Sequence, residues 1–136
     1  MALEWSEAYE TQIRKVDEQH QQLFRFANKL EELIGQEAAS SEEVEQLLHF
    51  LKTYAESHFR YEEACMAKRR CPAAKKNRLA HQTFMEFYED STASYRENGF
   101  SREWLERLNS FIQDWLHSHI CAVDIELRHC RGAPKT

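Results

Sequence analysis

The sequence predicts an all-α protein, an antiparallel up-down-up-down four-helix bundle with an N-terminal arm. Residues that favour helix dominate the 136-residue chain, which has only three glycines and two prolines. Apolar residues recur at spacings of three and four along four long segments, and no segment has the alternating pattern of a strand. Short connections join the segments, and short connections favour antiparallel neighbours. The length fits one domain over residues 1–136.

The first predicted helix runs from about residue 18 to residue 35 and follows an arm of residues 1–17. Asp17 is a suitable N-cap, because its carboxylate can accept a hydrogen bond from the first turn. The same carboxylate is also a possible acceptor for an imidazole N–H. Trp5 is the predicted anchor of the arm on the bundle. The apolar stripe of this helix consists of Leu23, Ala27, Leu30 and Ile34.

The second predicted helix runs from Ser41 to about Arg70. Ser40 and Glu43 have the spacing of a capping box, in which each side chain bonds the backbone N–H of the other residue. The helix is expected to end before Cys71, because proline follows at the next position. Its apolar stripe consists of Val44, Leu47, Leu48, Leu51, Tyr54 and Ala55.

The third and fourth predicted helices fill the rest of the chain. Pro72 suits the first turn of the third helix, which is expected to stop at Asn98 and Gly99. The fourth helix opens at Ser101 and runs to about His129, and residues 131–136 form a tail. The stripe of the third helix includes Phe84, Met85, Tyr88 and Tyr95, and that of the fourth includes Leu105, Leu108, Phe111, Ile112 and Trp115.

Composition argues against several functional classes. The 18 basic and 23 acidic residues are interspersed, the net charge is −5, and no basic stripe suits a nucleic acid. No apolar run reaches the roughly 18 to 20 residues of a membrane span, and the start "MALEWSEAYE" does not resemble a secretory signal. The cysteines show no CxxC spacing, so reduced thiols and a cytoplasmic location are expected. They are Cys65, Cys71, Cys121 and Cys130.

Each apolar stripe, when extended, reaches a polar residue. These residues lie early in the first and third helices and late in the second and fourth. In an alternating bundle those positions fall at the same end, so the side chains should converge in one region of the core. The residues are His20, His58, Glu62, Asn77, His81 and His119.

A lone histidine on an apolar face is usually a core residue with satisfied hydrogen bonds. Several such residues with a carboxylate at one depth are harder to explain, because each unsatisfied buried group costs about 1 to 3 kcal/mol. A bound cation would remove that cost by taking imidazole nitrogen and carboxylate oxygen as ligands, and this mixture suits iron, manganese or zinc. The other histidines, His49, His117 and His129, lie off the stripes and are expected at the surface or boundary.

Several segments together resemble the hemerythrin family, in particular single-domain bacterial hemerythrins. The resemblance covers nearly the whole chain, and its most specific elements are His58 with Glu62 and His119 followed five residues later by Asp124. A five-residue spacing turns a helix about 140° away from one face, so a local bulge or a long reach is expected before Asp124. The matching segments are Trp5, "VDEQHQQLF" at 16–24, "HFRYEEACM" at 58–66, Pro72, "HQTF" at 81–84 and "WLHSHICAVD" at 115–124.

The resemblance implies two non-heme irons that bind O2 reversibly. It implies that His20 and His58 hold the iron that receives O2. His81 and His119 would hold the second iron, and Glu62 and Asp124 would bridge the pair.

One position departs from the family pattern. Asn77 stands where the resemblance implies a third histidine on the second iron. The amide carbonyl could be a weak ligand, water could take the open position, or the second iron could be poorly bound so that the centre is mononuclear. Cys65, seven residues after His58, is a further possible neighbour of the metal, although a small core or boundary residue is the expected role.

The expected function is therefore an O2-binding carrier, store or sensor rather than an enzyme, with O2 or another diatomic molecule as its partner. A monomer is expected. The alternative is an iron enzyme of the same fold that acts on peroxide or nitric oxide, which the Asn77 position motivates. A ferritin-like di-iron oxidase is disfavoured, because only Glu126 with His129 fits its Glu-x-x-His pattern and lies at the wrong depth. A metal-free interaction bundle is disfavoured by the cost of burial.

Overall fold

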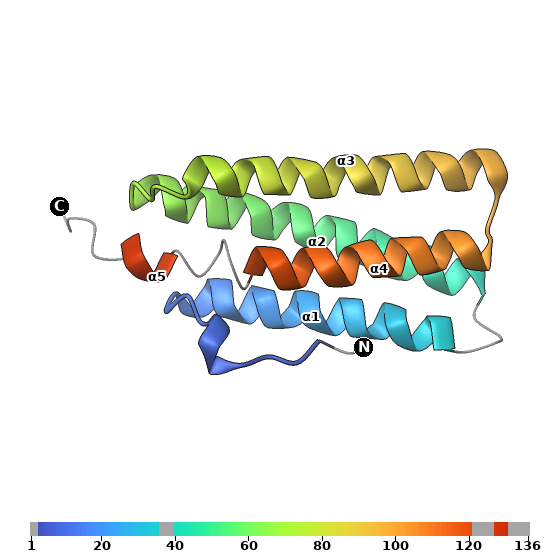
Figure 1. Cartoon of the computed structure of the whole chain (residues 1–136), viewed down its shortest axis with the longest axis horizontal. Coiled ribbons are helices and arrows are strands. Elements are labelled where there is room, and N and C mark those ends of the chain that lie inside the picture. The colour runs from blue at the N-terminus through green and yellow to red at the C-terminus, as the bar shows by residue number, and fades with distance from the viewer. Residues whose placement is uncertain (1–2, 36–39, 121–126, 131–136) are drawn as a thin grey trace.

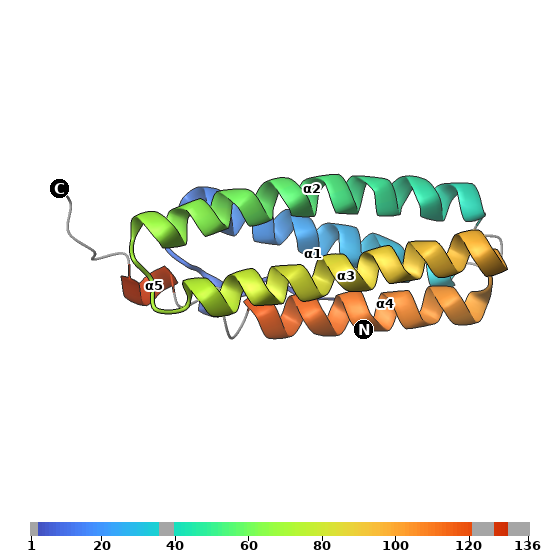
Figure 2. The same cartoon turned by 90° about the horizontal axis from the view of Figure 1, so that it is seen from above.

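The chain folds as a four-helix bundle in a computed structural model that describes residues 3–35, 40–120 and 127–130. The described residues contain no strand. Figures 1 and 2 show the four long helices side by side and antiparallel, which confirms the predicted fold class. The long helices are α1 (Arg14–Gly35), α2 (Ser41–Lys68), α3 (Ala74–Asn98) and α4 (Arg102–Ser118), and two short ones are a 3₁₀ turn (Glu7–Tyr9) and α5 (Leu127–Cys130).

The helices form a closed ring of neighbours. α1 packs against α2 and α4, and α3 packs against the same two helices from the other side. This order follows from the alternating direction of successive helices, since each short connection returns the chain beside the helix it has just left. No helix in the described ranges is long and apolar enough to cross a membrane.

The main core is a continuous apolar cluster between the four helices, and a smaller separate cluster consists of Val16, Met66, Cys71, Leu127 and Cys130. The main cluster contains most of the predicted stripe positions, although Leu33 replaces Ile34 as the buried residue at the end of α1. Ile34 is only partly buried against the cluster. The buried members include Leu23, Ala27, Leu30, Val44, Leu48, Leu51, Phe84, Leu105, Leu108, Ile112 and Leu116.

Helix ends confirm the local signals in the sequence. Ser40 and Glu43 form the predicted capping box at the start of α2. The Ser101 hydroxyl accepts a hydrogen bond from the backbone N–H of Trp104 and caps α4. Gly99 follows the last turn of α3 with a φ of 81°, a left-handed conformation in which glycine meets no steric penalty.

The start of α1 corrects one prediction. The helix begins at Arg14 rather than near residue 18, so Asp17 lies in the first turn and is not the N-cap. The Asp17 carboxylate accepts hydrogen bonds from the backbone N–H of Thr11 at 2.7 Å and from its hydroxyl at 2.9 Å. Asp17 therefore fixes the arm to the bundle, a tertiary contact that a capping pattern does not reveal.

The N-terminal arm runs back along α1 and α4. The Leu3 backbone and the Asn28 side chain exchange two hydrogen bonds of 2.7 and 2.8 Å. Trp5 lies against Phe24, with 5.7 Å between ring centroids, and against Tyr9 at 5.8 Å. Trp5 thus packs against the bundle as predicted.

The α2–α3 connection corrects three further predictions. α2 ends at Lys68 rather than near Arg70, and α3 begins at Ala74, so Pro72 lies in the connection and not in the first helical turn. Cys71 forms a disulfide with Cys130, and their Cα atoms are 5.3 Å apart. These two cysteines are therefore not the reduced thiols that the sequence suggested, and they no longer support a cytoplasmic location.

Candidate metal centre

The Glu62 carboxylate lies at the centre of the predicted polar cluster, and its two oxygens face different pairs of histidines. Oε2 is 2.8 Å from Nε2 of His20 and 3.3 Å from Nε2 of His58. Oε1 is 3.1 Å from Nε2 of His81 and 3.7 Å from Nε2 of His119. Imidazoles from all four long elements of the bundle thus converge on one carboxylate.

The cluster is sealed from solvent by the surrounding helices. The exposed fraction is between 0 and 3 % for the whole set of predicted polar residues that the structure describes. Such burial of titratable groups is costly unless partners or a cation compensate it. The residues are His20, His58, Glu62, Asn77, His81 and His119.

Two groups of side chains have the spacing of metal ligands, and they share one residue. His20, His58 and Glu62 form the first group, and Glu62, His81 and His119 form the second. Within each group the ligand atoms lie within 4.8 Å of one another. We call them the first and second subsites. A carboxylate shared by two imidazole pairs is an arrangement that can bridge two ions.

Electrostatics hold Glu62 in its charged form. Burial alone would raise the pKa of this carboxyl group. The opposing effect comes from the charge of His58 and from the other imidazoles that face the carboxylate, which hold the pKa well below its ordinary value. The carboxylate is therefore available as an anionic ligand between the four imidazoles.

Asn77 lies in the same buried region, one turn before His81 on α3. Positions four residues apart share a helix face, so both side chains belong to the inward face of α3. Neither the oxygen nor the nitrogen of the Asn77 amide has a hydrogen-bond partner in the part of the chain that the structure describes. A fully buried amide without a partner is unusual, and it requires an explanation.

Asp124, the other predicted bridging residue, lies outside the described residues, as does Cys121. The backbone at His119 and Ile120 has π-helical character directly after α4. A π-turn is a local bulge of the kind that the five-residue spacing to Asp124 predicts. The position of the Asp124 carboxylate stays a prediction.

Gln19 and Glu63, which the sequence analysis did not single out, hydrogen-bond the Nδ1 atoms of two of the four imidazoles. Nδ1 of His58 lies 2.7 Å from Oε1 of Gln19, and Nδ1 of His81 lies 2.8 Å from Oε2 of Glu63. Both oxygens are acceptors, so each ring donates through Nδ1, and Nε2 is the nitrogen that a cation beside Glu62 would take. Gln19 directly precedes His20 and Glu63 directly follows Glu62, which is a signal that a search around the ligands could have used.

Aromatic rings form the walls of the cluster. Phe59 stacks on His81, with 3.9 Å between ring centroids and 12° between planes. Trp115 stacks on His119 at 4.4 Å, and Trp5 lies 6.4 Å from His20. These contacts fix the imidazole planes and keep the region apolar.

The remaining sequence candidates lie away from the cluster. His49 and His117 are exposed, as predicted, and the side chain of His129 is outside the described residues. Cys65 is half-buried with a free thiol and belongs to neither group of ligand-like side chains.

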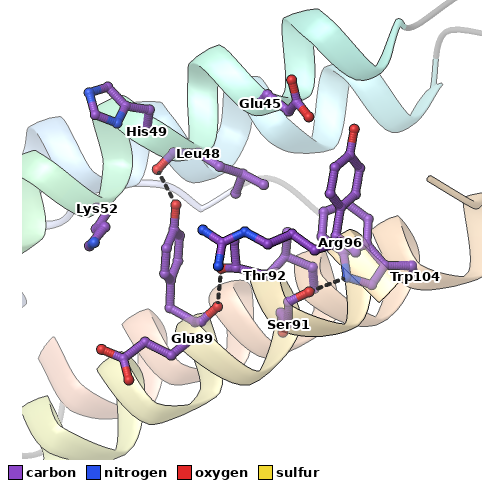
Figure 3. A pocket seen from close by; sticks show the side chains of 12 residues that line it. Glu45, Leu48, His49, Lys52, Glu89, Ser91, Thr92, Arg96 and Trp104 are labelled. Carbon is purple, nitrogen blue, oxygen red and sulfur yellow. Dashed lines mark hydrogen bonds between the residues drawn. The ribbon is translucent and has the colours of Figure 1, made fainter. Parts of the chain in front are cut away.

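Two surface cavities differ in their relation to the cluster. A cavity of about 420 Å³ lies between α2, α3 and α4, and Figure 3 shows Glu45, Lys52 and Arg96 around it. None of its lining residues belongs to either subsite. A second cavity, of about 350 Å³, is lined by His81 and Glu63 and therefore reaches the edge of the second subsite.

Comparisons with known proteins agree with this geometry. Residues 11–127 match the family described as Hemerythrin HHE cation binding domain. The chain is 29 % identical to a bacteriohemerythrin of Clostridium acetobutylicum over 127 residues, which cover 90 % of this chain and 95 % of that protein. No solved structure gives a significant match.

Proposed function

The chain belongs to the hemerythrin family and is a non-heme iron protein of that kind, and we propose that it binds two irons and reversibly binds O2. It would act as an oxygen carrier, store or sensor. The observation that carries the proposal is the shared carboxylate of Glu62, with a pair of imidazoles at each oxygen.

The residues present fit iron on chemical grounds. Imidazole nitrogen and carboxylate oxygen together suit iron, and every described member of the cluster is nine-tenths or more buried. The buried Asn77 amide has no hydrogen-bond partner among the described residues, which supports a bound ligand beside it. A cation between the imidazoles would compensate the polar burial.

The proposed ligands divide between the two subsites. His20 and His58 would hold the first iron, His81 and His119 the second, and Glu62 would bridge them. Asp124 is proposed as a second bridge from its place in the family pattern, and Asn77 as a weak ligand or the neighbour of an open position. Iron, when bound, supplies the electrons for reversible O2 binding.

The protein's own residues prepare the centre for that chemistry. Gln19 and Glu63 accept hydrogen bonds from Nδ1 of His58 and His81, so that Nε2 is the nitrogen of each ring that would bind a metal. Phe59 and Trp115 stack on ligand rings and exclude water from them. Exclusion of water is expected to slow irreversible oxidation of the centre.

The test is anaerobic reconstitution with Fe²⁺ followed by repeated exposure to O2 and to vacuum. We expect about two irons per chain and a visible band that appears with O2 and disappears on its removal. Glu62→Gln should lose most of the iron, whereas Glu45→Gln, on an exposed part of the same helix, should retain it. Loss of the band without recovery would exclude reversible binding.

Asn77 favours one second candidate, an iron enzyme that consumes peroxide or nitric oxide. An open position beside the second subsite would allow small molecules to react there rather than only bind. Steady consumption of H2O2 or NO by the iron-loaded protein, suppressed in Asn77→His, would support this candidate. Equal, negligible consumption by both proteins would leave O2 binding as the function.

A further inference from the structure

His81 is held at both ring nitrogens by consecutive residues of α2. Its Nε2 lies 3.1 Å from Oε1 of Glu62, and its Nδ1 lies 2.8 Å from Oε2 of Glu63. The ring also stacks on Phe59 at 3.9 Å. The imidazole can therefore neither flip nor rotate without losing a charge-assisted hydrogen bond.

The corresponding contact in the first subsite is chemically different. His58 has the neutral amide oxygen of Gln19 as the partner of its Nδ1, at nearly the same distance of 2.7 Å. A carboxylate partner makes an imidazole a stronger donor to a cation than an amide partner does, because it draws the Nδ1 proton toward itself. Of these two Nδ1 partners, Glu63 is the charged one and Gln19 the neutral one.

That charge stands at the subsite where Asn77 takes the place of a third histidine that the family resemblance implies. Asn77 lies one turn before His81 and offers an amide with no hydrogen-bond partner among the described residues. An amide oxygen is a poorer ligand for a transition metal than an imidazole. Glu63 and Asn77 therefore have opposite expected effects on the same subsite.

We propose that Glu63 is a positioning residue that compensates Asn77: it fixes His81 for coordination and supplies the negative charge that retains the second metal. This inference rests on the proposed function, because it assumes that both subsites bind iron. It adds a specific residue outside the ligand set that acts on the second subsite.

Substitution of Glu63 can test this proposal, because the side chain is partly exposed. Its side chain is 33 % exposed and lines the cavity of about 350 Å³ beside His81. A change to glutamine keeps the size and a hydrogen-bond acceptor but removes the charge. Glu56 lines the same cavity and is exposed, so Glu56→Gln is a matched loss of one charge.

The experiment is an anaerobic Fe²⁺ titration of the full chain, with Mössbauer spectra that report the two irons separately. Glu63→Gln should weaken the affinity for one of the two irons by about 10- to 100-fold and change only one set of Mössbauer lines. Glu56→Gln should change the affinity for either iron by no more than about 3-fold. Adding Asn77→His to Glu63→Gln should restore most of the lost affinity.

Several results would overturn the inference. Equal weakening by Glu63→Gln and Glu56→Gln would show a general charge effect, and equal weakening of both irons would show a structural role. Normal iron binding by Glu63→Gln would refute the inference alone. Failure of the unmodified protein to bind two irons would instead refute the proposed function, so the two failures are distinguishable.

Discussion

The two ends of the bundle are built from the same helices, but one end buries apolar side chains and the other buries a polar cluster. At one end, where α1 and α3 finish and α2 and α4 begin, the buried side chains are apolar, among them Leu30, Val44, Leu48 and Leu108. At the other end the same helices bury imidazoles and a carboxylate around Glu62. The apolar end gains free energy from burial, whereas the polar end must offset a desolvation cost.

This difference separates stability from function along the length of the molecule. The apolar end can hold the helices together without any ligand, because its side chains need only each other. The polar end has a small apolar cluster that includes Val16 and Met66, but the groups around Glu62 are stable to the extent that hydrogen bonds and a cation compensate their burial. Metal binding should therefore stabilise one end much more than the other.

The largest expected effect comes from adding or removing iron. At a free concentration about 1,000 times its Kd, each ion should raise the free energy of unfolding by about 4 kcal/mol, so two ions should raise it by about 8 kcal/mol. Urea denaturation with and without iron measures the total. Hydrogen exchange should slow most around His58 and His81 and least around Leu48.

Uniform slowing of hydrogen exchange along all four helices would contradict this division. It would mean that the two ends unfold as one unit, so that the metal acts on the bundle as a whole.

The second effect concerns the disulfide at the polar end. Cys71 and Cys130 are 59 residues apart in sequence, and closing a loop of that length should stabilise the fold by about 4 kcal/mol. Cys130→Ser should therefore lower the urea midpoint of the metal-free protein markedly. Cys65→Ser changes a free thiol and serves as the control, with an expected change of about 0.5 kcal/mol or less.

If Cys130→Ser and Cys65→Ser were equally stable, the disulfide would add nothing, and the polar end would depend on metal alone. If the stability lost in Cys130→Ser returned when iron was added, the ion and the disulfide would stabilise the same part of the bundle.

Helical periodicity was sufficient to predict the fold and the inward face of each helix. The same spacing that placed Leu51 in the core also placed His58 and Glu62 there, because one helix face holds them all. Matching depth then predicted that His20, His81 and His119 would meet them. Capping signals such as Ser40 with Glu43 are equally local, so the sequence reveals them directly.

Contacts between distant segments could not be predicted in the same way. Thr11 draws the Asp17 carboxylate into a tertiary contact, so the residue that looked like a cap fixes the arm instead. Cys71 and Cys130 carry no spacing signal, because the fold brings them together across 59 positions. Glu63 looked like any charged helical residue, since its partner His81 lies on another helix.

The third effect tests the apolar end by itself. Leu108 of α4 is only 2 % exposed, and Leu108→Ala should lower the free energy of unfolding by about 3 kcal/mol through lost burial and a cavity. The iron content at saturation should not change, because Leu108 belongs to neither subsite. Urea denaturation and iron analysis on the same sample measure both quantities.

Loss of iron from Leu108→Ala would show that the packing of the apolar end sets the geometry of the centre. The two ends would then differ in the residues that they bury, but they would not be energetically independent.

The smallest expected effect comes from a helix cap at the apolar end. The Ser40 hydroxyl accepts a hydrogen bond from the backbone N–H of Glu43 at 3.1 Å, and Ser40→Ala should cost about 1 kcal/mol. Because this cap begins α2 at the apolar end, the cost should be the same with and without iron. A double-mutant cycle with Glu62→Gln should give a coupling energy near zero, since distant sites without shared partners add. Coupling above about 0.5 kcal/mol would instead mean that α2 transmits strain along its whole length from the cap to the metal ligands.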